Sequence, residues 1–290
     1  YMGDVIADLN TRRRQVSTTD KRGKDTEISA ILTLAKIFQY INNLISKRNY
    51  DAQKNVLLGD QVEGRHAVRE LLLAGTRKTR EVFLAGDLED APILDDIIDL
   101  ADEAKATIKE IPRSRFESIA KTESSQGVVA LAAPLPNYEI EELTQPEDDE
   151  SKPFLLVIDG VTDPGNLGAM LRSAECAGIT GVILPRHRSA KITPAVTKTA
   201  AGAIEHLRIA TASGIPAALG RLRESGIWIV GLDAGGSTPL YDLKIADQPI
   251  ALVLGSEGRG LSRLTRERCD ELVHIPLKGV LASLNVSTAA

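Results

Sequence analysis

Cysteine, aromatic residues and long apolar runs are all scarce in this chain of 290 residues, and each scarcity excludes a class of protein. The two cysteines, Cys176 and Cys269, have no CxxC spacing and cannot form a disulfide framework. Aromatic residues make up 3% of the chain, which argues against recognition by stacking several bases. The most apolar early stretch, residues 28–45, carries a lysine and several amides and is too polar to span a membrane. We expect a soluble protein of the reducing cytoplasm.

Metal motifs and a basic overall charge are also missing. The sequence has no HExxH, no paired CxxC and no acidic calcium loop, so no bound metal is expected. The net charge of −5 and the pI near 5.5 do not by themselves indicate a nucleic-acid binder. Local patches of charge steer RNA to a protein more than the total does, so the placement of arginine and lysine matters more.

The first 57 residues read as an extension outside the main domains. Residues 11–24 are basic, polar and without periodicity, which predicts a flexible arm. Residues 28–45 place apolar side chains at helical spacing, which predicts an amphipathic helix with one apolar stripe. The pattern does not indicate what that stripe packs against, and the role of the extension stays open.

Residues 58–135 alternate between helical and strand patterns. Helices are expected over residues 65–73, 92–105 and 114–121, and strands over residues 81–85, 107–111 and 127–132. Such alternation predicts a small α/β domain. Basic side chains gather near one end of it and are the candidates for contacting RNA phosphates: Arg65, Arg69, Arg77, Lys78 and Arg80.

Residues 136–152 read as a linker, because this part of the chain is rich in proline, acidic and poor in apolar residues. Its acidity would keep it away from RNA phosphates. We therefore expect the domains on either side to be free to close around a substrate.

Residues 153–290 form the second domain in this reading. Strands are expected over residues 154–159, 181–184, 206–210, 227–232, 250–254 and 272–275, with a helix over 167–177. Strands that alternate with helices predict a parallel sheet covered on both faces.

Three short blocks in this domain combine glycines with polar side chains at the end of an apolar run. They occupy residues 159–172, 254–260 and 275–287. An α/β protein presents its catalytic groups in this way, since a buried strand fixes the position and the following loop carries the chemistry. The blocks therefore predict one composite site.

The blocks resemble the three signature motifs of the SpoU/TrmH family, the RNA ribose 2′-O-methyltransferases of the SPOUT fold. The first is carried by Asn166, Gly168 and Arg172, the second by residues 255–258 and the third by residues 283–287. The resemblance covers about residues 58–290 and is nearest to the bacterial enzymes that methylate a guanosine ribose in 23S rRNA. It implies an L30e-like substrate-binding domain, a SPOUT domain with a trefoil knot, and a homodimer formed through that SPOUT domain.

The same resemblance implies a cofactor and roles for particular residues. The methyl donor is S-adenosyl-L-methionine, and the positions that would hold it are Leu254, Gly255, Ile275, Leu277 and Leu284. The positions that would carry the chemistry are Asn166, Arg172, Glu257, Ser283 and Asn285. For Arg172 two roles stay open: a clamp on the target phosphate, or the base that accepts the 2′-hydroxyl proton.

A basic loop after one predicted strand adds Arg186 and Arg188 as candidates for holding RNA phosphates. Two alternatives to an rRNA methyltransferase stay open, namely a tRNA 2′-O-methyltransferase and a non-catalytic RNA-binding or ribosome-assembly protein. A nucleotide-dependent oxidoreductase is rejected, because the loop after the first strand of the second domain lacks GxGxxG.

Overall fold

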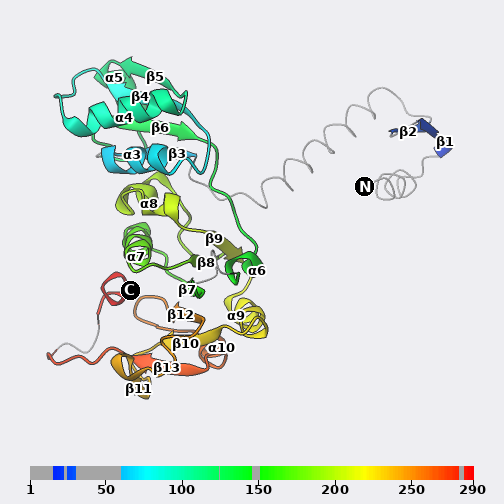
Figure 1. Cartoon of the computed structure of the whole chain (residues 1–290), viewed down its shortest axis with the longest axis vertical. Coiled ribbons are helices and arrows are strands. Elements are labelled where there is room, and N and C mark those ends of the chain that lie inside the picture. The colour runs from blue at the N-terminus through cyan, green and yellow to red at the C-terminus, as the bar shows by residue number, and fades with distance from the viewer. Residues whose placement is uncertain (1–15, 23–24, 31–59, 124, 146–150, 281–283) are drawn as a thin grey trace. The chain divides into compact units, whose positions relative to one another are not determined.

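The computed structural model describes residues 16–22, 25–30, 60–123, 125–145, 151–280 and 284–290 (Figure 1). The chain divides into two compact units, residues 1–55 and residues 56–290. No helix in these described ranges combines the length and the apolar character that crossing a membrane requires.

The first unit contains a two-stranded antiparallel sheet, which differs from the arm and helix expected there. Strand β1 (Val16–Arg22) pairs antiparallel with β2 (Asp25–Ala30). Both strands contain β-branched residues, which favour extended backbone, and the ladder satisfies their peptide groups. Thus the predicted arm is a strand over residues 16–22, and the predicted helix is a strand over residues 28–30. Residues 31–45 of that helix lie outside the described residues.

The second unit begins with a four-stranded mixed sheet in the order β3-β6-β4-β5. Its strands are β3 (Gln61–Glu63), β4 (Thr79–Ala85), β5 (Thr107–Ile111) and β6 (Val128–Ala132). Helices α3 (Arg65–Ala74) and α4 (Pro92–Glu103) pack on one face, and α5 (Arg113–Ile119) packs on the other through Phe116. The predicted helices and strands of this region are all present.

The strand β3 was not predicted, because its sequence is mostly polar. Glu63 is nevertheless fully buried. Its carboxylate accepts hydrogen bonds from Gln61 Nε2 at 2.8 Å and from the backbone nitrogens of Lys121 and Thr122 at 2.7 and 3.0 Å. A buried carboxylate is tolerated when it is hydrogen-bonded in this way.

The following segment is more structured than the predicted linker. Helix α6 (Ile140–Leu143) buries both of its terminal side chains against the next sheet, in a cluster with helix α9 (Ile215–Glu224). Leu135 is buried as well, in the cluster on the other face of that sheet. The part of this segment from Leu135 to Leu143 is therefore packed on the second sheet.

The second sheet has seven strands in the order β11-β13-β10-β12-β7-β8-β9, and every pair is parallel, as predicted. The strands are β7 (Phe154–Ile158), β8 (Gly181–Pro185), β9 (Ile209–Ala212), β10 (Trp228–Leu232), β11 (Thr238–Pro239), β12 (Ile250–Leu254) and β13 (Glu271–His274). The remaining helices are α7 (Pro164–Cys176), α8 (Pro194–Thr199), η1 (Ala203–His206), η2 (Leu240–Asp242), α10 (Arg263–Arg266) and α11 (Val286–Ala289).

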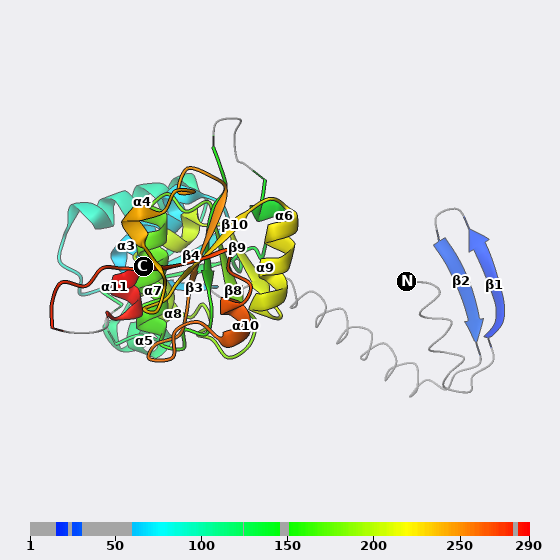
Figure 2. The same ribbon diagram turned by 90° about the horizontal axis from the view of Figure 1, so that it is seen from below.

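Helices cover both faces of this sheet, and strand alternation explains how (Figures 1 and 2). Leu156 and Ile158 point to the face that α7 and α8 cover, whereas Leu155 and Val157 point to the face of α6 and α9. The central strand β7 is thus apolar on both of its faces. The sheet lies between two hydrophobic clusters that together form the core of this domain.

Two predicted boundaries in this domain shift for local reasons. The strand expected over residues 206–210 begins at Ile209, because Gly202, with φ +89°, leads into the 3₁₀ turn η1. Helix α7 begins at Pro164 rather than at residue 167, since Asp163 caps it and proline suits a first helical position. The trefoil knot expected from the resemblance stays a prediction.

Candidate active site

Three loops that carry polar side chains leave the same edge of the parallel sheet. β12 lies between β10 and β7, and Leu254 pairs with Leu232 on one side and with Ile158 on the other. These three residues end their strands, so the loops that begin at Asp233, Gly255 and Asp159 start side by side. The carboxyl edge of a parallel sheet is where such proteins place their ligands.

The loop after β12 folds back on itself so tightly that its first residue must be glycine. Ser256 and Gly260 exchange two backbone hydrogen bonds, of 3.1 and 2.9 Å. A Cβ atom on Gly255 would lie 2.1 Å from the carbonyl carbon of Gly260. Gly258 and Gly260 also have positive φ, +72° and +64°, which favours glycine. The tight turn therefore requires glycine at position 255, and residues 255–258 and Gly260 line the space in front of it.

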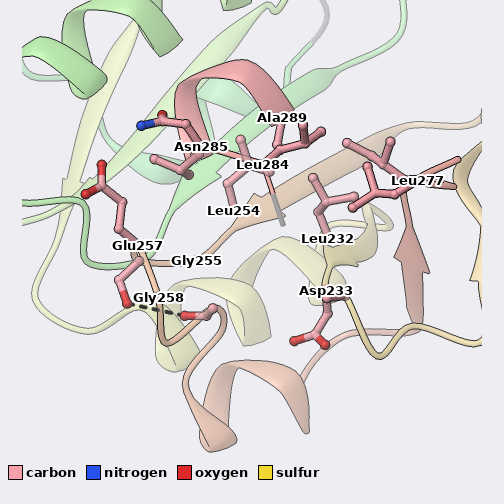
Figure 3. Close-up of a pocket in the computed structure, with 15 residues that line it drawn as sticks. Leu232, Asp233, Leu254, Gly255, Glu257, Gly258, Leu277, Leu284, Asn285 and Ala289 are labelled. Atoms are coloured by element: carbon pink, nitrogen blue, oxygen red, sulfur yellow. Dashed lines mark hydrogen bonds between the residues drawn. The ribbon is translucent and has the colours of Figure 1, made fainter. Parts of the chain in front are cut away.

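A cavity of about 470 Å³ lies against this loop (Figure 3). Its walls come from the ends of β10, β12 and β13 and from α11. All five positions predicted to hold the cofactor line it: Leu254, Gly255, Ile275, Leu277 and Leu284. The volume is in the range of small-molecule sites, about 300–1,000 Å³. The structure thus brings together residues separated by 30 positions in the chain.

Two of the residues predicted for the chemistry, Glu257 and Asn285, also line this cavity. Figure 3 shows both on the same side of the view, away from Leu277. The Asn285 side chain caps α11, since its Oδ1 accepts hydrogen bonds from the nitrogen and the hydroxyl of Ser287 at 2.8 and 2.6 Å. Its position is therefore set by the helix it starts. Ser283 lies outside the described residues.

Asn166 joins the first motif to the second. Its backbone nitrogen donates a hydrogen bond to the Asp163 carboxylate at 2.7 Å, which caps α7. Its side-chain nitrogen Nδ2 donates to Glu257 Oε1. The helix start and the glycine loop are thereby tied together across the carboxyl edge of β7 and β12.

Arg172 is not part of the cavity wall. It lies almost two turns along α7 from Asn166, its side chain is exposed, and it makes no hydrogen bond or ion pair with the described residues. The structure therefore does not bring Arg172 together with Glu257 and Asn285 within one chain.

Asp233 is a site residue that the sequence reasoning missed. It follows β10, lines the cavity and is 8% exposed. Its carboxylate accepts hydrogen bonds from Gly235 N at 2.8 Å and from Arg266 Nη2 at 2.5 Å. The signal was an acidic residue and two glycines directly after a predicted strand, a pattern that ligand-binding loops of α/β proteins share.

The structure corrects one predicted RNA contact. Arg77 is buried, and its guanidinium donates to the Glu205 carboxylate at 2.6 and 2.8 Å, so it cannot meet an RNA phosphate at the surface. Arg69 is paired with Asp96 and Glu70, both at 3.0 Å, and these bonds raise its pKa. Lys78 is exposed.

Arg65 is half-buried and donates through Nε to the carbonyl oxygen of Gln126 at 3.2 Å. Arg186 and Arg188 are exposed and follow β8, the strand beside β7. Their loop is tied to the loop after β7, because Ala190 N donates to the carbonyl oxygen of Val161 at 2.8 Å. Both arginines thus stand at the same edge of the sheet as Asn166.

Comparison with known proteins agrees with this geometry. Residues 153–290 match the SpoU rRNA Methylase family, and residues 61–138 match the family described as RNA 2′-O ribose methyltransferase substrate binding. The chain is 37% identical over 233 residues to the 23S rRNA (guanosine-2′-O-)-methyltransferase RlmB of Photobacterium profundum, which covers 79% of this chain and 93% of that protein.

Two further relatives extend the comparison. A Staphylococcus haemolyticus protein, named for the TrmH family of tRNA/rRNA methyltransferases, is 36% identical over 230 residues, covering 79% of this chain and 91% of its own length. The SpoU methyltransferase AviRb from Streptomyces viridochromogenes, solved with AdoMet, has the same fold, with a TM-score of 0.66 at 23% identity over 83% of this chain and 89% of that one. The chain belongs to the SpoU/TrmH family of RNA 2′-O-ribose methyltransferases.

Proposed function

We propose that this protein methylates the ribose 2′-hydroxyl of a guanosine in 23S rRNA, with S-adenosyl-L-methionine as the methyl donor. The observation that carries the proposal is the cavity at the carboxyl edge of β12, walled by the second and third motifs and joined to the first by the Asn166–Glu257 hydrogen bond. The relatives named RlmB, at 37% and 39% identity, support 23S rRNA as the substrate.

The cavity fits the proposed cofactor in size and in chemistry. Leucine and isoleucine side chains offer an apolar surface for an adenosyl group, and the glycine loop offers backbone donors and acceptors. Bound there, S-adenosylmethionine supplies a methyl group activated by a sulfonium. Leu254, Gly255, Ile275, Leu277 and Leu284 would hold it.

The remaining residues act on the ribose and its phosphate in this proposal. A 2′-hydroxyl is a weak nucleophile, so alignment and charge stabilisation must lower the barrier to its attack. Asn166 holds Glu257 at the cavity, and Asn285, fixed by its cap on α11, supplies an amide beside it. Ser283 belongs to the same motif. These groups would orient the ribose.

Arg172 would clamp the target phosphate and stabilise the alkoxide as it forms, since a guanidinium stays protonated. It stands outside its own chain's cavity, which supports a homodimer through residues 153–290 in which each chain supplies Arg172 to its partner.

Residues 58–135 would bind the RNA, through Arg65, Arg69 and Lys78, and Arg186 and Arg188 would add phosphate contacts beside the cavity. Residues 1–57 form an extension in this division of the chain. With rRNA as the substrate, the protein works in the cytoplasm.

Methyl incorporation tests the proposal. The protein is incubated with radiolabelled S-adenosylmethionine and with 23S rRNA or bulk tRNA lacking 2′-O-methyl marks, and alkali-resistant linkages are then mapped. Label at one linkage of 23S rRNA is expected. Label in tRNA alone would overturn the rRNA assignment and favour the second candidate function, a tRNA 2′-O-methyltransferase. The name of the staphylococcal relative, which includes tRNA, supports that candidate. Label in neither RNA would contradict both.

A further inference from the structure

A buried ion pair joins the RNA-binding domain to the catalytic domain. Arg77 precedes β4 in the first sheet, and Glu205 lies in η1, which precedes the edge strand β9 of the second sheet. The guanidinium donates to both carboxylate oxygens, at 2.6 and 2.8 Å, and also to the carbonyl oxygen of Ala133 at 2.7 Å. The side chains of Arg77 and Glu205 are 2% and 0% exposed.

The backbone around this pair is built for close approach of the two domains. Gly202 has a φ of +89°, and a Cβ atom there would lie 2.3 Å from the Cβ of Glu70 on α3. His206 Nε2 lies 3.1 Å from Glu70 Oε2. Residues of α8 also contact β3. Two helical segments of the catalytic domain therefore pack directly on the RNA-binding domain, which differs from the freely hinged pair expected from the linker.

A buried ion pair of this kind specifies one geometry. The forked guanidinium matches a carboxylate only in one plane and at one separation. If the domains rotated or slid, both charges would lose their partner while still buried, which is strongly unfavourable. An apolar interface of the same area would tolerate such sliding, because dispersion contacts are not directional.

We propose that Arg77 and Glu205 are positioning residues that lock the RNA-binding domain in one orientation on the catalytic domain. The span between bound RNA and the cavity is then fixed, so an RNA held by residues 58–135 delivers its target ribose at a set place. Two binding surfaces held at the correct separation bind one RNA more tightly than two loosely tethered surfaces, because the second contact then forms at a high effective concentration. The consequence for RNA, though not the lock itself, rests on the proposed function.

Distance measurement between spin labels tests the lock without any RNA. One label is placed on Glu224→Cys, exposed at the end of α9, and the other on Glu103→Cys, exposed at the end of α4, in a Cys176→Ser and Cys269→Ser background. Labelled protein is diluted with unlabelled protein, so that only distances within one chain are read. The unmodified interface is expected to give one narrow distribution. A broad distribution would overturn the proposal.

Two double variants separate the lock from simple stability. Arg77→Met with Glu205→Leu fills the buried space with apolar side chains of similar size and removes the directional ion pair. This variant is expected to fold and to give a broader distribution of distances between the labels. The swap of Arg77→Glu with Glu205→Arg restores a pair and is expected to narrow it again. Glu267→Gln, a surface ion-pair variant elsewhere, is the matched control. A distribution that stays narrow in the folded Met/Leu variant would overturn the lock.

A kinetic measurement then tests the consequence for RNA. In the Met/Leu variant the KM for 23S rRNA is expected to rise about tenfold or more, while the Kd for S-adenosylmethionine stays within about twofold. An unchanged KM would refute the positioning role. Unmodified protein that labels no RNA would instead count against the proposed function, and the spin-label distances would still decide whether the lock exists.

Discussion

The side-chain amide of Asn166, in the first turn of α7, donates a hydrogen bond to the carboxylate of Glu257, in the loop after β12. The two residues are 91 positions apart in the chain. Their contact holds one oxygen of the Glu257 carboxylate, and Glu257 lines the cavity. An amide carries no charge at any physiological pH, so the donor capacity of Asn166 does not change with pH.

Asn166→Ala is therefore expected to lower kcat. Removing one hydrogen bond to a charged group costs about 1.5–3 kcal/mol, which corresponds to about a tenfold to hundredfold loss of rate if the bond is needed in the transition state. Single-turnover methylation of rRNA measures it. The control is Glu267→Gln, whose carboxylate pairs with Arg263 on the surface of α10. An Asn166→Ala enzyme with full rate would show that the contact is structural only.

Gly255→Ala is expected to weaken S-adenosylmethionine binding about tenfold or more. The new Cβ atom would meet the Gly260 backbone at 2.1 Å, so the loop must open and the cavity wall moves. Isothermal titration calorimetry measures the affinity. Gly220→Ala is the matched control, since it lies inside α9 with space for a methyl group and should stabilise the helix by about 1 kcal/mol. Equal affinities in the two variants would refute the role of the tight loop.

If Arg172 clamps the target phosphate as proposed, Arg172→Lys is expected to reduce kcat by about 10²- to 10³-fold, because a point charge cannot replace a planar fork on a phosphate at the transition state. Stability and cofactor affinity should not change, since the side chain is exposed and makes no bond with the described residues. The measurements are single-turnover rate, thermal melting and cofactor titration. Arg263→Lys on α10 serves as the exposed control. A variant that melts early would show that Arg172 supports the fold instead.

Arg186→Ala combined with Arg188→Ala is expected to weaken rRNA binding evenly across sequences. For each arginine–phosphate interaction that the substitutions remove, the slope of log affinity against log salt should become less steep by about 0.7 to 0.9. Filter binding over a range of salt concentrations measures this slope. An unchanged slope would show that the exposed loop after β8 does not touch the RNA backbone.

The two cysteines are expected to react very differently with a thiol reagent. Burial raises the pKa of Cys269 to about 11, so near pH 8 only about one thiol in a thousand is ionised, while Cys176 is exposed. Ellman's reagent should titrate one thiol quickly and the second only on unfolding. The folded state holds the Cys269 proton more tightly than the unfolded state, because the folded pKa lies above the usual value of 9.0. The resulting contribution to the free energy of unfolding is complete below about pH 9 and is lost as pH rises toward 11. Fast reaction of both thiols would contradict this.

Much of the fold could be predicted because its patterns are local. Strand alternation and apolar runs located β7, β12, the helices of the first domain and α7, and the parallel sheet followed from the order of strands and helices. The positions that line the cavity came from motif resemblance, which joined Gly255 with Leu284 although they are distant in the chain.

What could not be predicted depends on contacts between distant residues. Arg77 looked like a surface arginine, since its partner Glu205 is 128 positions away and nothing local indicates burial. Strand β3 was missed for the same reason. Its three residues are mostly polar, and Glu63 can be buried only because the distant backbone nitrogens of Lys121 and Thr122 donate hydrogen bonds to its carboxylate. Asp233 follows a predicted strand and precedes two glycines, but none of the three motifs includes it.

The walls of the cavity also determine when the site can exist during synthesis. The RNA-binding sheet is complete once the chain reaches Ala132, the end of β6, whereas the cavity needs residues up to Ala289. A ribosome adds about 5–20 residues per second, so the two events are separated by roughly ten to thirty seconds. The first sheet can thus form before the cavity does, and the cavity is complete only when α11 has left the exit tunnel.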